Sequence, residues 1–267
     1  MSSFLDTMAR SSRQRVEEAV RARPLAAVAE AAAEQRAPRP IDGFGRSFDL
    51  IAEIKPRSPA TGAFPVRDHV ESASSYRQGG AAMISVLTEP GAFGGSLDVL
   101  RRVGSAVDIP VMAKDFLVDP YQVYQARASG ADGILLIARI LPDEALSALR
   151  LLAESLGMFT LLEVFDQHDL DRVLAASDHG SLIGVNCRDL DSLDVAPDRH
   201  RDLAGSLPAG RVAVAESGLH GPEDVERVAA LGYRAALVGS SLMRSDRPAD
   251  VVSSMIEAGR RAEVVVQ

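Results

Sequence analysis

Eight short apolar segments are spaced along residues 49–238 of this chain. They are rich in Ile, Val and Leu and do not alternate with polar residues, which is typical of parallel strands buried on both faces. The segments cover residues 49–54, 82–87, 110–113, 133–137, 159–164, 182–185, 212–215 and 235–238. Eight strands separated by helical patterns predict an α/β fold of the (β/α)₈ TIM barrel type.

Helical patterns separate many of these strands, and several begin with proline or an acidic residue and end at glycine. The patterns cover residues 66–78, 120–128, 142–156, 167–175 and 222–230. The main alternative fold is an open doubly wound sheet, which usually carries a G-x-G-x-x-G turn after its first strand. Here the first strand runs into KPRSPATG. The barrel is therefore favoured.

Helical sequence also precedes the first strand. Residues 3–22 predict an amphipathic helix and residues 25–36 a second, alanine-rich one. The apolar stripe of the first helix is expected to consist of Phe4, Leu5, Met8, Val16 and Val20. Residues 37–46 contain two prolines and two glycines and predict a linker.

These patterns suggest one domain over residues 1–267. Residues 1–47 would be an N-terminal helical extension, and residues 48–260 the barrel. A barrel of this kind takes about 250 residues, so a second domain is not needed. As a hypothesis, the N-terminal helix helps to cover the mouth of the barrel.

Composition narrows the class of partner. A net charge of −8 argues against a nucleic-acid or anionic-membrane surface. The one cysteine allows no intrachain disulfide, and the five histidines lack metal-ligand spacing, so no metal site is expected. No apolar run approaches the roughly 18 residues that span a bilayer, and the N-terminus lacks the apolar core of a signal peptide. A cytoplasmic protein without a membrane partner is predicted.

Charged side chains stand at the ends of three predicted strands. Glu53 and Lys55 are two residues apart and point to the same side of the first strand, Lys114 ends the third strand, and Glu163 lies at the end of the fifth. A structural ion pair, or a lysine that reaches into solvent, would explain each of them singly. In a barrel, however, all these strand ends meet at one mouth, where they would supply general acids and bases.

Polar residues at the later strand ends predict substrate and phosphate contacts. Asn186 and Arg188 follow the sixth strand, where Asn can orient a hydroxyl and Arg can bind a carboxylate with two parallel hydrogen bonds. The loops after strands seven and eight often bind phosphate in barrels. Gly218, Gly239 and Ser240 lie in these loops and could donate backbone N–H groups.

Several of these segments also carry a family resemblance. IAEIKPRSPATG, VLTEPGAFGGSLDVL, KDFLVDPYQVYQARASGADGILLIARIL, LLEVFD, IGVNCRDL, AESGL and LVGSSLMR resemble, in order, the motifs of indole-3-glycerol-phosphate synthase. The resemblance covers nearly the whole chain. It implies a cytoplasmic enzyme of tryptophan biosynthesis that needs no metal or organic cofactor.

The resemblance implies a carbon–carbon lyase. The substrate would be 1-(2-carboxyphenylamino)-1-deoxyribulose 5-phosphate, and ring closure, decarboxylation and dehydration would give indole-3-glycerol phosphate, carbon dioxide and water. The implied catalytic residues are Lys114, Glu163, Lys55 and Glu53, with Lys114 as general acid. The implied substrate contacts are Ser58, Phe93, Phe116, Asn186, Arg188, Glu216 and Ser217, and the implied phosphate contacts are Lys55, Gly218, Gly239 and Ser240.

Some positions depart from the family pattern, and other functions stay open. The departures are Ala60, Ala92, Ala113 and Cys187, none of which removes a proposed acid or base. The alternatives are a specialised paralogue for a related anthranilate-derived sugar phosphate and a non-catalytic scaffold barrel. Phosphoribosylanthranilate isomerase is disfavoured because its strand-one cysteine is absent here. A monomer is expected, with a weak homo-oligomer as the alternative.

Overall fold

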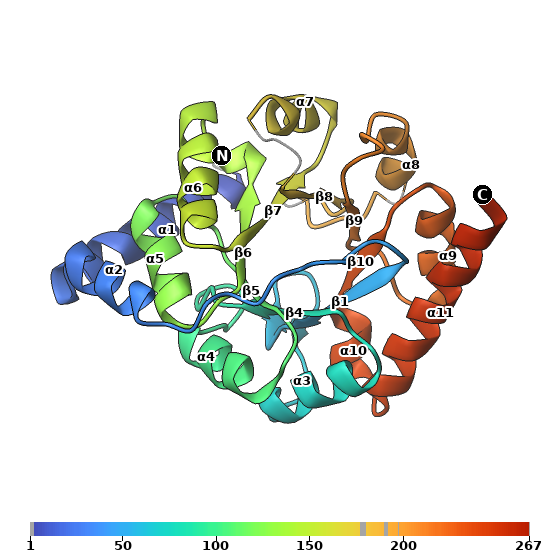
Figure 1. Ribbon diagram of the computed structural model, residues 1–267, viewed down its shortest axis with the longest axis horizontal. Coiled ribbons are helices and arrows are strands. Elements are labelled where there is room, and N and C mark those ends of the chain that lie inside the picture. Colours follow the sequence, from blue (N-terminus) through green and yellow to red (C-terminus); the bar gives the residue numbers. More distant parts are fainter. Residues whose placement is uncertain (1–2, 177–179, 190–191, 197, 267) are drawn as a thin grey trace.

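Parallel strands form a closed barrel in the computed structural model, which describes residues 3–176, 180–189, 192–196 and 198–266. The strands are hydrogen-bonded in the order β1-β10-β9-β8-β7-β6-β5-β4 (Figure 1). They are β1 (Asp49–Ile54), β4 (Met83–Leu87), β5 (Val111–Lys114), β6 (Gly133–Ile137), β7 (Phe159–Val164), β8 (Leu182–Asn186), β9 (Ala213–Glu216) and β10 (Ala235–Val238). The predicted eight-stranded barrel is confirmed.

Helices surround the strands and form the outer layer (Figure 1). They are α3 (His69–Gln78), α4 (Leu97–Ala106), α5 (Pro120–Ala128), α6 (Asp143–Ser155), α7 (Gln167–Ala176), α8 (Asp198–Ala204), α9 (Pro222–Ala230), α10 (Ser240–Arg244) and α11 (Pro248–Val266). The five predicted helical patterns are present; α5 and α9 have the predicted ends, and the ends of α3, α6 and α7 differ by one to three residues. For example, α3 starts after Asp68, whose side chain accepts from the backbone N–H groups of Val70 and Glu71.

Sequence patterns missed several elements. The missed helices are α4, α8, α10 and α11, and a 3₁₀ turn, η1 (Ala138–Ile140), follows β6. A small antiparallel hairpin of β2 (Arg57–Ser58) and β3 (Gly62–Ala63) interrupts the loop after β1. In the part of the chain that the structure describes, no helix is long and apolar enough to cross a bilayer.

The N-terminal extension consists of α1 (Phe4–Ala22) and α2 (Leu25–Ala33), and α2 packs against α5 (Figure 1). Leu5, Met8 and Val16 of the predicted stripe are buried. Val20 is 41% exposed, so its place in the stripe was wrong. At this end of the helix Ala19 packs toward Tyr121 instead, which turns Val20 outward.

Apolar side chains fill the barrel interior. This inner cluster includes Ile51, Met112 and Leu161 and is separate from the larger cluster between strands and helices. Because side chains alternate along a strand, the residue two places after an interior side chain also points inward. This alternation decides which residues face the mouth.

Candidate active site

Alternation places one charged side chain after each of three interior apolar residues. Glu53 follows Ile51 on β1, Lys114 follows Met112 on β5, and Glu163 comes two residues after Leu161 on β7. Both glutamates are buried, at 3% and 1% exposure. Buried charge is costly unless it is paired, so these groups need one another.

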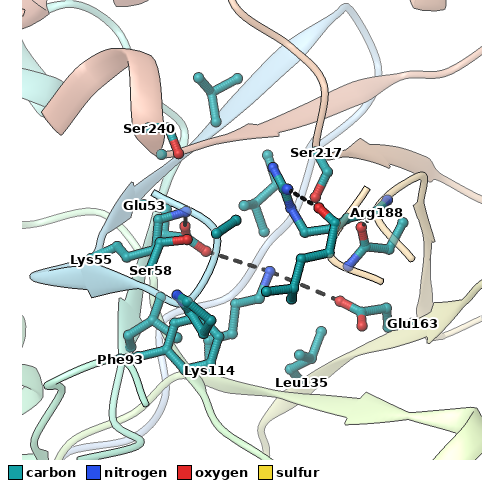
Figure 2. Close-up of a pocket in the computed structure, with 18 of the residues that line it drawn as sticks. Glu53, Lys55, Ser58, Phe93, Lys114, Leu135, Glu163, Arg188, Ser217 and Ser240 are labelled. Carbon is teal, nitrogen blue, oxygen red and sulfur yellow. Dashed lines mark hydrogen bonds and ion pairs between the residues drawn. The ribbon is translucent and has the colours of Figure 1, made fainter. Parts of the chain in front are cut away.

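The amino group of Lys114 lies among three carboxylates. Its Nζ is 2.9 Å from Glu216 Oε2, 3.4 Å from Glu53 Oε2 and 3.9 Å from Glu163 Oε2. Lys55 Nζ is 2.9 Å from the other Glu53 oxygen. Figure 2 shows Lys114 reaching across the cavity between Glu53 and Glu163. Residues up to 163 positions apart in sequence thus meet in one place.

Burial and charge set the protonation of these groups. Burial alone would lower the pKa of Lys114, but the three carboxylates outweigh it and raise that pKa. Burial would raise the pKa of Glu53, yet the two lysine charges lower it to about 2. Burial and the charge of the neighbouring Glu216 raise the pKa of Glu163 to about 8. Together they outweigh the charge of Lys114, which would lower this pKa. At neutral pH the mouth therefore holds a charged ammonium on Lys114, an ionised carboxylate on Glu53 and a protonated carboxyl group on Glu163.

Glu216 lies behind the amino group of Lys114. It is fully buried and does not line the cavity, so its expected contact with substrate stays a prediction. Gly184 gives it room, because a Cβ there would collide with Glu216 Oε1. Glu216 Oε1 and Glu163 Oε2 are buried without a hydrogen-bond partner among the described residues. The structure gives Glu216 an ion pair with Lys114 and places its carboxylate beside that of Glu163.

The cavity at the mouth gathers the other candidate residues. It is lined by Glu53, Lys55, Ser58, Phe93, Lys114, Phe116, Glu163, Asn186, Arg188, Ser217, Gly218, Gly239 and Ser240. Sequence reasoning missed further lining residues, which are Phe4, Leu135, Leu193 and His220 among others. Phe4 belongs to α1, and its ring meets Phe116 edge to face with centroids 6.2 Å apart. Helix α1 therefore contributes to the wall of the cavity.

The loop after β8 folds back on itself. Arg188 forms an isolated bridge with Val195, and its Nη1 donates to the Leu193 carbonyl oxygen at 2.7 Å. Asn186 Oδ1 accepts from the Arg188 backbone N–H at 2.9 Å. These bonds orient Arg188 and Asn186 while both still face the cavity. The Cys187 thiol points away and donates to the Ser217 carbonyl oxygen at 3.2 Å.

The turns after β9 and β10 have constrained backbones. Ser217 has φ 66°, a left-handed conformation that residues other than glycine seldom adopt. Gly239 directly follows β10, and a Cβ there would collide with the Glu53 carboxylate. The short helix α10 then begins at Ser240. These two turns bring backbone N–H groups to the side of the mouth where barrels often hold phosphate.

One sequence signal for this site was overlooked. Of the 29 lysines and arginines in the chain, only Lys55 and Lys114 are lysines. Both line the same cavity. Arginine serves for the other basic positions, which suggests that these two positions require an amine that can donate a proton.

Metal ligands do not gather in the described residues, where no group of three or more His, Cys, Asp or Glu could hold an ion. His179 lies outside the described residues.

Sequence comparisons with known proteins point to one family. The family model described as indole-3-glycerol phosphate synthase matches residues 5–255. The enzyme of that name from Mycobacteroides abscessus is 44% identical over 233 residues, which cover 85% of both chains. The one from Nocardioides sp. is 43% identical over 256 residues, or 95% of this chain and 98% of the relative. The solved 3-hexulose-6-phosphate synthase from Salmonella typhimurium has a TM-score of 0.64 at 11% identity, over 82% of this chain and 100% of its own, which shows the barrel fold alone.

Proposed function

Because this chain belongs to the indole-3-glycerol phosphate synthase family, we propose how the groups at its mouth divide the work of that reaction. The chain is a carboxy-lyase of tryptophan biosynthesis. The reaction converts 1-(2-carboxyphenylamino)-1-deoxyribulose 5-phosphate to indole-3-glycerol phosphate, carbon dioxide and water. It needs a proton for a ketone oxygen, and later a base and an acid for the loss of water.

Lys114 supplies the first proton. As the aromatic carbon that bears the carboxylate attacks the ribulose ketone, the ketone oxygen becomes a strongly basic alkoxide. An ammonium with a raised pKa can still protonate such a base, and its positive charge stabilises the developing oxyanion. The observation that carries this assignment is the position of the Lys114 ammonium, in the cavity and among three carboxylates.

Glu53 and Glu163 then serve the dehydration. Glu53 is ionised at neutral pH and lines the cavity, so it acts as the base that removes the carbon-bound proton. Glu163 is protonated at neutral pH and donates to the departing hydroxyl group. Lys55 holds the Glu53 carboxylate in place through their 2.9 Å ion pair. Environments that push two carboxyl pKa values apart are a common basis for such a division.

The remaining lining residues bind the two ends of the substrate. Phe93 and Phe116, whose ring centroids are 6.1 Å apart, form the apolar wall for the anthranilate ring. Arg188 lies near the substrate carboxylate. The contacts with the hydroxyl groups come from Ser58, Asn186 and Ser217, and those with the phosphate from Lys55, Gly218, Gly239 and Ser240.

A fluorescence assay tests the activity directly. The pure protein is incubated with the carboxyphenylamino substrate while indole fluorescence is followed. Appearance of the signal supports the synthase, whereas binding without turnover supports a scaffold barrel. Faster turnover of a ring-substituted substrate than of the plain one would indicate a specialised paralogue.

The role of Glu163 predicts a pH dependence. An acid with a pKa of about 8 is competent below that pH, so kcat should fall as pH rises through about 8. Glu163→Gln cannot ionise, so its kcat should be lower and should not fall in this range. A profile of kcat between pH 6 and 9.5 measures both. A rate that rises through pH 8 in the native enzyme would make Glu163 a base and contradict this assignment.

Location and assembly follow from the same reading. A cytoplasmic location is favoured because the substrate is a sugar phosphate with a second anionic group, which does not cross membranes unaided.

A monomer is favoured because one chain supplies every residue assigned to the cavity. Sedimentation velocity of the active enzyme tests this against a weak homo-oligomer.

A further inference from the structure

Helix α1 holds the turn that follows β5 from outside the barrel. Arg15 Nη2 donates to Asp115 Oδ1 at 2.6 Å, and Nη1 donates to Oδ2 at 3.2 Å. Ser12 Oγ donates to the carbonyl oxygen of Phe116 and accepts from Gln122 Nε2 at 2.8 Å. Both residues that follow Lys114 in sequence are therefore bonded to α1.

The Asp115 carboxylate connects this contact to the backbone of Lys114. Asp115 Oδ1 accepts from the Phe116 backbone N–H at 2.8 Å, and Oδ2 accepts from Thr88 Oγ1 at 3.0 Å. The Thr88 backbone N–H donates to the Lys114 carbonyl oxygen at 2.9 Å. Asp115 is only 8% exposed and forms an ion pair with Arg15. Loss of the guanidinium would leave a buried charge at the base of the catalytic lysine.

Other contacts keep α1 on the barrel without Arg15. Val16 packs with Val28 and Tyr121 in a separate apolar cluster. The Tyr121 hydroxyl also lies 3.0 Å from the carbonyl oxygen of Ala19 and 2.8 Å from that of Arg23. A cavity beside Arg15 separates part of α1 from the β4–α4 loop, so the Arg15 side chain is not a packed core element. A variant at Arg15 should therefore fold with α1 in place.

We propose that Arg15 is a positioning residue for ring closure. Its guanidinium fixes Asp115, and Asp115 fixes the backbone on both sides of the β5 turn. The Lys114 ammonium is thereby held at the substrate ketone. This inference rests on the proposed role of Lys114 as general acid. It assigns to the N-terminal extension a part in turnover besides its part in the cavity wall.

Arg15→Met tests the proposal, with Arg36→Met as a control for the loss of another arginine of the N-terminal extension, although Asp132 keeps its 3.0 Å ion pair with Arg39. Arg36 Nη1 makes a 2.7 Å ion pair with Asp132, so it also joins the N-terminal extension to a buried barrel aspartate, but one next to the start of β6. Displacing a catalytic group by about an ångström can lower the rate on the order of 10²-fold. Arg15→Met should only partly loosen the position of Lys114, so we expect kcat to fall about tenfold. Arg15→Lys should recover part of that loss, and Arg36→Met should leave kcat within about twofold of the native value.

A second background separates positioning from general weakening. In Lys114→Ala, Arg15→Met should change the residual rate by less than about twofold, because Arg15 acts through Lys114. Lysine labelled with ¹³C at Cε should give two NMR signals, and Arg15→Met should shift the Lys114 signal while Arg36→Met leaves it. Equal rate losses in both backgrounds, or an unmoved signal with native kcat, would overturn the proposal.

The same variants distinguish a failure of the positioning role of Arg15 from a failure of the proposed role of Lys114. Near-native turnover in Lys114→Ala would sink the role of Lys114 itself. An inactive Lys114→Ala with a fully active Arg15→Met would sink only the positioning role. If Arg15→Met does not fold, Ser12→Ala removes the bond to the Phe116 carbonyl instead. A smaller fall in kcat in that variant, again absent from the Lys114→Ala background, would support the proposal, and native kcat would overturn it.

Discussion

Lys114→Ala should lower kcat by at least about 10²-fold, the low end of what a positioned acid contributes. The ketone oxygen then has no nearby ammonium to protonate it, and Lys55 is occupied by Glu53 at 2.9 Å. The barrel should persist, because its apolar core does not include Lys114 and the freed carboxylates can take up protons. Indole fluorescence gives the rate, and circular dichroism during heating reports the fold.

Lys114→Arg is the control for charge. A guanidinium keeps the positive charge among the carboxylates, so the melting temperature should lie near the native value. The larger, planar guanidinium does not place an N–H group where the Lys114 ammonium lies, so it should be a poor proton donor at that point. Turnover should therefore stay well below native. Native turnover in either variant would remove Lys114 from the mechanism.

Glu53→Gln should lower kcat by about 10²-fold or more. The amide has nearly the same shape, so it still fits beside Gly239, but it cannot accept the proton that dehydration releases. The two lysines also lose the carboxylate that they share at 2.9 and 3.4 Å. If dehydration becomes the slow step, a decarboxylated intermediate should accumulate, and rapid quench followed by mass spectrometry would detect it.

Asp169→Asn provides the comparison for Glu53→Gln. Asp169 is 2% exposed and paired with Arg139 at 2.8 Å, yet it does not line the cavity. Its loss should lower thermal stability with little change in kcat. A Glu53→Gln enzyme no slower than Asp169→Asn would show that Glu53 serves only the structure.

Sequence pattern was sufficient for the barrel and for most of the cavity. Apolar strands followed by charged residues define both the interior and its mouth, because side chains alternate along each strand. Glu53, Lys114 and Glu163 could be assigned to one face on that basis alone. The count of lysines, which points to Lys55 and Lys114, would have strengthened the assignment.

The rest depends on distances that no linear pattern encodes. The opposite pKa shifts of Glu53 and Glu163 arise because one lies between two ammonium groups and the other beside Glu216. The pairing of Arg15 with Asp115 joins residues 100 positions apart. Val20 was misplaced because Ala19, not Val20, faces Tyr121 at this end of α1. Each of these features is set by how helices and strands pack.

The presence of only two lysines allows one measurement to test the central arrangement. Enzyme labelled at lysine Cε is titrated with indole-3-glycerol phosphate and then with base, and Lys114→Ala assigns the signals. We predict that both signals shift along one saturation curve and that the Lys114 signal titrates above its ordinary pKa of 10.5. A Lys114 signal that ignores the product, or that titrates below 10.5, would contradict a shared cavity in which carboxylates hold this ammonium.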